Sequence, residues 1–320
     1  MAVYTKINKK DISIINNKFD IETLKSNIRK QGFNVNLAPL MRLDIVQDQL
    51  TTDVIWTHHH SIIDGWSVPV IFNALMSCYF SLSHGQGLPS LPPCQYRHYV
   101  NWLHEQNTDQ ALEFWRSKLS GADSKNALGF HELRHEQAVN YCSSTIKLHT
   151  DLTENLTQFA KRSQVTVSTL LQGTWAWILS KYSGDSTVCY GATVSGRPAN
   201  VPLSSEMVGL FINSLPIVTE LKTSLSVEQW LQSLQLTIAE SEENGYVPLS
   251  EIAATLGKKG SELFDSLFIF ENYPKEETAA DSELETQLSI TKKATEEWTT
   301  YPLTIMVADG ASILIRLVLD

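Results

Sequence analysis

The hydrophobic positions of this chain change repeatedly between a helical period and strand-like runs. Apolar residues spaced three or four positions apart predict amphipathic helices, and short apolar or alternating runs predict strands. Helices are expected at 22–31, 68–82, 108–119, 152–163, 167–182 and 226–240. Strands are expected at 44–47, 52–58, 143–148, 187–194, 264–271, 303–307 and 313–318. This mixture, without internal repeats, indicates an α/β protein.

The chain of 320 residues is long enough for two hydrophobic cores. Residues 121–140 are polar and irregular, so we expect a lobe boundary there, with lobes at 1–136 and 137–320. A second polar and acidic stretch, 275–287, is expected to be an exposed loop.

The most informative stretch is Trp56–Ser67, which reads Trp-Thr-His-His-His-Ser-Ile-Ile-Asp-Gly-Trp-Ser. An apolar strand there brings histidines to an Asp-Gly turn, and imidazole is suited to moving protons near neutral pH. We expect a strand over Asp53–His60. Since side chains alternate along a strand, His58 and His60 would share one face and His59 would point the other way, as a supporting residue.

A lone histidine in such a strand is more often structural than catalytic, but three adjacent histidines followed by Asp-Gly favour a functional site. His58, His60 and Asp64 could also supply three metal ligands. No distant His, Cys or Glu motif completes such a site, so no metal is expected.

Composition narrows the classes of function. The formal net charge is −10, which argues against nucleic acid or an anionic membrane as partner. No apolar run is long enough to span a bilayer, and the N-terminus lacks the apolar region of a signal peptide. The four cysteines form no Cys-x-x-Cys pair, which is typical of reduced thiols in the cytoplasm.

The spacing His-His-x-x-x-Asp-Gly, followed by Trp-Ser, resembles the signature of the condensation domains of nonribosomal peptide synthetases, in the chloramphenicol acetyltransferase-like superfamily. It is filled here by His59, His60, Asp64, Gly65, Trp66 and Ser67. Further blocks are similar to that family at Ala38–Arg42, Tyr96–Trp102, Ser195–Pro198, Val208–Pro216, Tyr246–Ile252, Phe264–Pro274 and Tyr301–Thr304. In the Tyr96–Trp102 block, His98 replaces the family's aspartate.

The resemblance implies a two-lobed chloramphenicol acetyltransferase-like sandwich. The family's opening blocks and its last helix have no counterpart here, so the first lobe is expected to be incomplete. A chain truncated in this way is expected to have little condensation activity alone, because the tunnel that positions both substrates needs the intact fold.

In this family an acceptor amine attacks a thioester carbonyl held on a phosphopantetheine arm. The partners implied are donor and acceptor peptidyl carrier proteins and an adjoining adenylation domain. No cofactor is expected to bind directly, because phosphopantetheine arrives on the carriers. The blocks at 209–216 and 270–274 look most like the subtype that takes an L-configured donor. The rivals are an epimerisation domain of the same superfamily, an inactive fragment and a non-catalytic carrier-docking platform.

By motif position, His60 would accept the proton of the amine or hold the amine in line, and His59, Asp64 and Gly65 would complete the catalytic motif. Trp66 and Ser67 are expected on the substrate side. Asn213 could donate to the thioester oxygen or oxyanion, or it could be a satisfied strand amide. Asp64 could orient the His60 ring or be a buried structural carboxylate with an arginine partner, either Arg197 or one in the family's missing opening segment. We predict that it is turned back into the protein and paired with Arg197, because a buried unpaired carboxylate is costly.

Overall fold

The computed structural model describes residues 12–15, 20–48, 51–120, 142–271, 299 and 301–319. The chain divides into two compact units: unit 1 is Met1–Tyr96 with Ser205–Leu210, and unit 2 is Arg97–Ser204 with Phe211–Asp320. This division falls earlier in the chain than the expected boundary. That boundary at 136–137 and the expected loop at 275–287 both lie outside the described residues.

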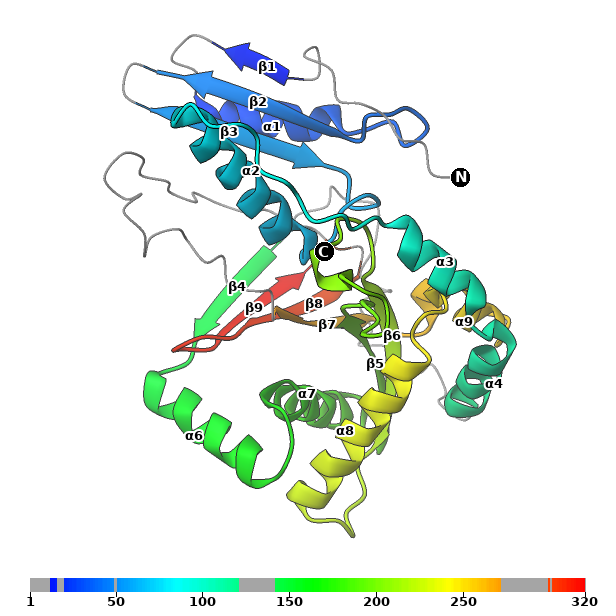
Figure 1. The fold of residues 1–320 in the computed structure, drawn as a ribbon. Helices are drawn as coiled ribbons and strands as arrows, with labels where there is room; N and C mark the ends of the chain where they lie inside the picture. Colours follow the sequence, from blue (N-terminus) through cyan, green and yellow to red (C-terminus); the bar gives the residue numbers. More distant parts are fainter. Residues whose placement is uncertain are drawn as a thin grey trace. The chain divides into compact units, whose positions relative to one another are not determined.

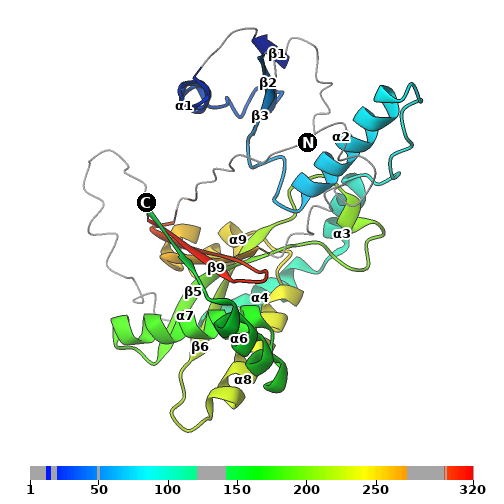
Figure 2. The ribbon, with the colours of Figure 1, turned by 90° about the vertical axis from the view of Figure 1, so that its left-hand side faces the viewer.

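Unit 1 contains a three-stranded sheet in the order β1-β2-β3 (Figure 1). Its strands are β1 (Ile12–Ile15), β2 (Met41–Gln47) and β3 (Thr52–His58). β1 runs parallel to β2, and β2 and β3 form an antiparallel pair in which Met41 lies opposite His58. The helix α1 (Ile21–Gln31) lies on one face of this sheet, which Figure 2 shows nearly edge-on.

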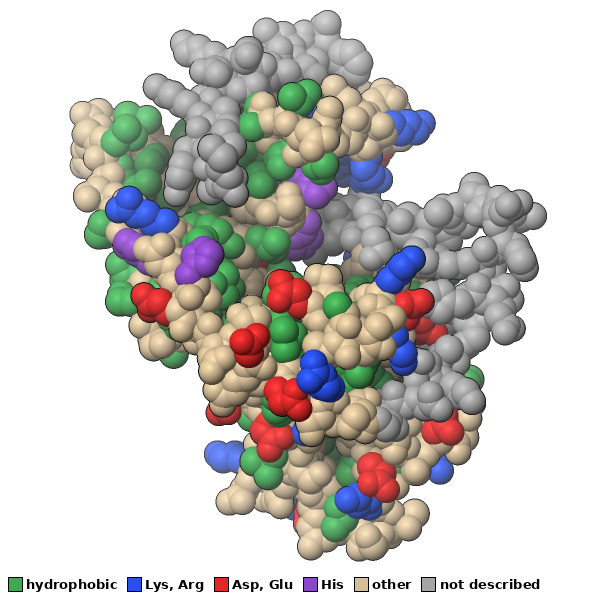
Figure 3. All heavy atoms as spheres, turned by 90° about the vertical axis from the view of Figure 1, so that its right-hand side faces the viewer, with side chains coloured by type: hydrophobic (Ala, Val, Ile, Leu, Met, Phe, Trp, Pro, Cys, Tyr) green, Lys and Arg blue, Asp and Glu red, His purple; other side chains and the backbone are tan. Residues whose placement is uncertain are grey.

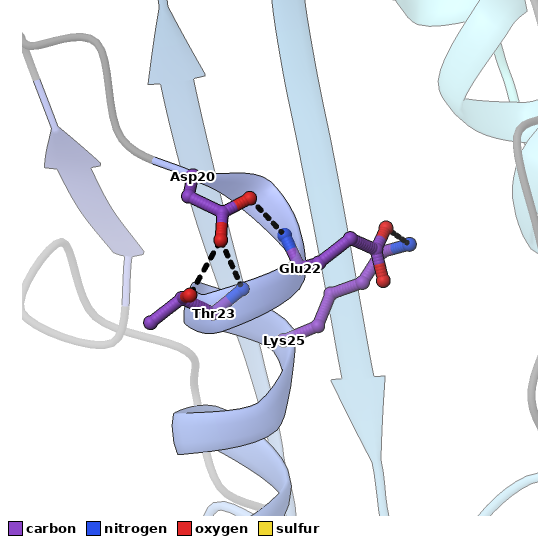
Figure 4. A network of polar contacts seen from close by, with 4 residues as sticks. All are labelled: Asp20, Glu22, Thr23 and Lys25. Atoms are coloured by element: carbon purple, nitrogen blue, oxygen red, sulfur yellow. Dashed lines mark hydrogen bonds and ion pairs between the residues drawn. The ribbon is translucent and has the colours of Figure 1, made fainter.

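The helix α1 begins directly after Asp20, which caps its N-terminus. Asp20 accepts hydrogen bonds from the backbone N–H groups of Glu22 and Thr23, both at 3.3 Å, and from the Thr23 hydroxyl (Figure 4). These bonds satisfy donors that the first helical turn leaves open, and they lower the pKa of Asp20. Lys25 forms an ion pair with Glu22 at 2.7 Å. The local sequence is thus sufficient to start α1.

Three further helices follow in the first half of the chain. They are α2 (Ser67–Ser83) in unit 1, and α3 (Arg97–Glu105) and α4 (Thr108–Leu119) in unit 2. The hydrophobic pattern predicted α2 and α4 but not α3. Trp115 of α4 is fully buried, and its indole N–H donates to the carbonyl oxygen of Asn244 at 2.9 Å.

Unit 2 is built on a six-stranded sheet in the order β4-β9-β8-β7-β5-β6. Neighbouring strands are antiparallel except for β5 with β7 and β7 with β8. The strands are β4 (Cys142–Lys147), β5 (Thr187–Val194), β6 (Asn213–Glu220), β7 (Ser266–Glu271), β8 (Leu303–Ala308) and β9 (Leu314–Leu319). A mixed sheet of this kind agrees with the α/β class that the sequence predicted.

Helices lie on both faces of this sheet. α6 (Thr150–Arg162), α7 (Val167–Ser183) and α8 (Val227–Glu243) lie along one side, as Figures 1 and 2 show. One apolar core joins buried residues of α7 and α8 to alternate residues of β5, while a second joins α4 and α9 (Leu249–Ala254) to the other face of that strand. Two short 3-10 turns complete the described elements, at Ser204–Glu206 and Gly260–Glu262.

We predict that the cysteines differ sharply in their reaction with iodoacetamide. Cys142 is exposed, whereas Cys189 is buried in β5, where burial raises the pKa of its thiol to about 12. Because the thiolate is the nucleophile, Cys142 should be alkylated first and Cys189 only after unfolding. Peptide mapping by mass spectrometry checks this, with a urea-unfolded sample as the control. Equal labelling of both residues in the native protein would contradict it.

Candidate functional site

The histidine motif lies where β3 ends. The strand stops at His58, so His59 and His60 lie in the following turn, and the expected strand over Asp53–His60 is two residues too long. The turn is held by two backbone hydrogen bonds, from His59 N–H to the Leu40 carbonyl at 2.9 Å and from Ile62 N–H to the His59 carbonyl at 3.2 Å. Strand alternation therefore does not decide where the His59 and His60 side chains point.

The three histidines have different environments. The His58 ring lies 4.8 Å from the Trp56 ring. The Nδ1 atom of His59 accepts the backbone N–H of Ser61 at 3.1 Å and lies 2.7 Å from the Ser61 hydroxyl. His60 is the exposed histidine of the three. His59, whose ring is hydrogen-bonded, therefore lies immediately before the exposed His60.

The metal alternative gains no support from this geometry. Across the ranges that the structure describes, no three His, Cys, Asp or Glu side chains gather closely enough to hold a metal ion, so His58, His60 and Asp64 do not form such a group.

Asp64 lies at the centre of a buried hydrogen-bond network in unit 1. Its side chain is 1% exposed, and its Oδ1 accepts from the backbone N–H of Ser67 at 2.9 Å and lies 2.8 Å from the Ser67 hydroxyl. The Ser67 oxygen accepts the N–H of Gly209 at 3.1 Å, and the Asp64 N–H donates to the Gly209 carbonyl at 3.2 Å. This network joins the histidine motif to a segment 142 residues further along the chain.

This network bears on the expected role of Ser67. The residue is 0% exposed, and its hydroxyl is bonded to Asp64 and Gly209. Its contacts are those of a structural residue at the first position of α2, so a place on the substrate side stays a prediction. Trp66, the residue that precedes α2, is half-buried, and Gly65 lies in the turn before it.

Replacing Ser67 by alanine should lower the free energy of unfolding of unit 1 by about 1–3 kcal/mol, because the buried Gly209 N–H loses its acceptor. Urea unfolding measures the change. Ser83→Ala, at the exposed end of the same helix, is the matched control and should have a much smaller effect. Equal changes in both variants would contradict the role of Ser67.

The segment Ser205–Leu210 is held in unit 1 by two more contacts. The Tyr96 hydroxyl donates to the Leu210 carbonyl, and the Cys94 thiol donates to the Glu206 carbonyl at 3.1 Å. Gly209 lies against the Tyr96 ring, where an added Cβ would overlap ring atoms. The sequence alone did not predict these pairings. A glycine at position 209 indicated that another group packs closely there, but the sequence did not show that this group is the Tyr96 ring.

Arg197 contacts the two residues that flank the segment Ser205–Leu210, and both of these residues belong to unit 2. It donates to the Ser204 carbonyl, and its guanidinium carbon lies 4.0 Å from the centroid of the Phe211 ring. The preceding Gly196 has φ +61°, and a Cβ there would overlap the Phe211 carbonyl oxygen. A contact between Asp64 and Arg197 would join the two units, so this pairing stays a prediction.

Several sequence blocks meet in one aromatic cluster of unit 2. The Phe211 ring lies 4.5 Å from Tyr99, Tyr99 stacks on Trp102 at 5.9 Å, and Trp102 meets Tyr246 edge-on at 6.1 Å. The Tyr246 hydroxyl donates to the Asn107 carbonyl at 2.9 Å, and burial raises the pKa of Tyr246. This packing covers the aromatic face of the helix formed by residues 97–105.

Asn213 has the contacts of a structural amide. Its two N–H groups donate to the carbonyls of Gly245 at 2.9 Å and Val247 at 2.8 Å, and its oxygen accepts the Ser214 N–H at 2.9 Å. Of the two roles left open by the sequence, the geometry favours the satisfied strand amide. An oxyanion role would require one of these bonds to break.

The surface carries charges of both signs. His98, where the similar family has aspartate, is exposed in the first turn of α3. On the face drawn in Figure 3, Lys and Arg side chains are interspersed with Asp and Glu side chains in the coloured region.

Among the helices in the described part of the chain, none is long and apolar enough to cross a membrane.

Comparison with known proteins shows which family this chain resembles in sequence. The family model described as "Condensation domain" matches residues 3–318. A linear gramicidin synthase of Brevibacillus parabrevis is 37% identical over 94% of this chain. Tyrocidine synthase 2 of the same organism is 34% identical over 90% of it. The matches cover 6% and 8% of these two synthases, so the chain spans under a tenth of their length.

Solved structures share the fold at low sequence identity. The X-domain from teicoplanin biosynthesis aligns with a TM-score of 0.77 and 18% identity, over 96% of this chain and 73% of that one. The first condensation domain of the calcium-dependent antibiotic synthetase, in complex with a substrate analogue, aligns with a TM-score of 0.69 and 13% identity, over 97% and 72%. With the family model matching nearly its whole length, this chain belongs to the condensation-domain family.

Proposed function

We propose that this chain forms an amide bond between a donor acyl group and an acceptor amine, each carried as a thioester on a phosphopantetheine arm. The observation that carries the proposal is the exposed His60 in the motif of a condensation-domain family member. The partners would be donor and acceptor carrier proteins and an adjoining adenylation domain. One structural neighbour is a four-domain nonribosomal peptide synthetase, which supports such a multidomain setting. A cytoplasmic location belongs to the same proposal.

In this reaction the amine nitrogen attacks the thioester carbonyl carbon. A C–N bond forms, the C–S bond breaks, the amine loses a proton and the departing sulfur gains one. His60 would accept the amine proton or hold the amine in line for attack. Asp64 would act indirectly, because its oxygen is engaged with Ser67 inside the protein. The loop held by Ser67 and Gly209 would keep the motif turn in one conformation.

The test supplies both partners separately. The chain is mixed with two loaded carrier proteins. The donor carrier holds an L-aminoacyl group, and the acceptor carrier holds an aminoacyl group whose amine is free to attack. The carrier-bound dipeptide is then measured by mass spectrometry, and binding of each carrier is measured alongside. Dipeptide formation above the rate of the carriers alone, even at the low rate expected for this chain by itself, supports the proposal.

The rival functions give different results in the same experiment. A docking platform or an inactive fragment would bind carriers without forming dipeptide. An epimerisation domain would convert a single carrier-bound L-residue to its D-form with no acceptor present, which chiral chromatography detects. Either result would replace amide formation as the assigned function.

A further inference from the structure

The ring of Phe33 contacts both a cation and the first histidine of the motif in unit 1. The guanidinium carbon of Arg42 lies 4.6 Å from the centroid of the Phe33 ring. The Phe33 and His59 rings are 6.4 Å apart between centroids, at an interplanar angle of 88°. Three separate segments therefore meet here: the loop after α1, the start of β2 and the turn after β3.

Arg42 is itself fixed from two sides. Its Nη2 donates to the Ile28 carbonyl of α1 at 3.0 Å, and its backbone lies opposite Thr57 in the β2–β3 pair. Its Nε atom is buried and has no hydrogen-bond partner among the described residues. A partly desolvated guanidinium over an aromatic face is a favourable pair, because the ring face is negative. Arg42 thus holds the plane of Phe33.

His59 is held by Phe33 on its ring and by Ser61 at Nδ1. Since the Ser61 backbone N–H donates to Nδ1, the neutral ring carries its hydrogen on Nε2. The His59 backbone N–H is bonded to the Leu40 carbonyl, so both the ring and the main chain of this residue are fixed. The next residue, His60, is exposed and takes its position from this turn.

We propose that Arg42 and Phe33 are positioning residues, which hold the His59 ring and thereby the turn that carries His60. The inference rests on the proposed function where turnover is concerned, but the arrangement itself can be measured without turnover. It adds two residues to the motif, neither of which touches the reacting atoms.

The experiment compares Phe33→Leu, Phe33→Tyr and Arg42→Lys with the parent chain. Phe33→Leu keeps apolar volume but removes the ring, Phe33→Tyr keeps the ring, and Arg42→Lys keeps the charge but loses the planar guanidinium. Trp177→Leu is the matched control, because Trp177 is an exposed aromatic residue of unit 2 beneath Lys181 at 5.7 Å.

The first measurement is NMR of the histidine rings, with His59 and His60 assigned from His59→Gln and His60→Gln. The ring protons of both residues should shift or broaden in Phe33→Leu, shift less in Arg42→Lys, and remain in place in Phe33→Tyr and Trp177→Leu. Because loss of a nearby ring shifts the His59 signals by itself, the deciding signal is that of His60: unchanged His60 signals in Phe33→Leu would overturn the proposal, whether or not the chain forms dipeptide.

The second measurement is the rate of dipeptide formation. Misplacing a catalytic group by a fraction of an ångström lowers the turnover number, so Phe33→Leu should lose about tenfold in kcat. The KM for each loaded carrier should stay within about twofold, since positioning acts on the reacting groups and not on carrier binding. Phe33→Tyr should restore most of the rate. An unchanged kcat in Phe33→Leu, beside an active parent chain, would also overturn the proposal.

Discussion

Replacing His60 by alanine is expected to lower the turnover number for dipeptide formation by about 100- to 10,000-fold, the range found when a general acid–base residue is removed. The imidazole is the exposed group of the motif, so its removal should leave the buried Asp64–Ser67–Gly209 network intact. The unfolding midpoint and the affinity for each carrier should therefore stay close to those of the parent chain. Single-turnover kinetics with both loaded carriers measures the change.

The matched control is His84→Ala. His84 is also exposed, and it follows the last residue of α2, where its ring nitrogen lies 2.9 Å from the Phe80 carbonyl. This variant should retain the parent rate. If His60→Ala formed dipeptide as fast as His84→Ala, His60 would have no role in the chemical step.

Replacing Gly196 by alanine is expected to lower the free energy of unfolding of unit 2 by about 3 kcal/mol or more. Two costs add: roughly 1 kcal/mol for a left-handed backbone conformation and roughly 2 kcal/mol for forcing a methyl group into a filled space. The overlapping atom is the backbone oxygen of Phe211, whose ring is packed between Arg197 and Tyr99. The backbone has little freedom to move away.

Gly257→Ala separates the two costs. Gly257 has φ +67°, close to the +61° of Gly196, but an added Cβ there meets nothing within 4 Å. It should therefore cost only the left-handed conformation, about 1 kcal/mol. Urea denaturation of both variants, followed by tryptophan fluorescence, measures the difference. Equal losses in the two variants would show that the Phe211 backbone gives way without cost.

These two predictions concern parts of the site that differ in how far they could be read from sequence. The motif that contains His60 is contiguous, so its residues could be identified directly. The clash at Gly196 depends on Phe211, which lies well beyond it in the chain and returns to contact it. Likewise, the network that holds Asp64 depends on Gly209, and the position of His59 depends on Phe33 and Arg42.

The sequence by itself determined most of the local elements and the family. Hydrophobic spacing predicted α1, α2, α4, α6, α7 and α8, and the strands other than β1 and β6, to within a few residues. It did so because amphipathic spacing is a local property. The helix α3 was missed although Tyr99, Trp102 and Leu103 have helical spacing, because its 9 residues are fewer than the stretch over which such a period is recognised.

Only the tertiary structure decided where the strand before the histidines ends and what surrounds them. The last β2–β3 pair is Met41 opposite His58, and beyond it the His59 N–H still donates to the Leu40 carbonyl while the His59 carbonyl accepts the Ile62 N–H of the turn. Ser67 proved to be a buried link to Gly209 and Asn213 a support for residues 245–247. Hydrogen-bond partners distant in sequence are chosen by packing, and a single sequence does not specify that packing.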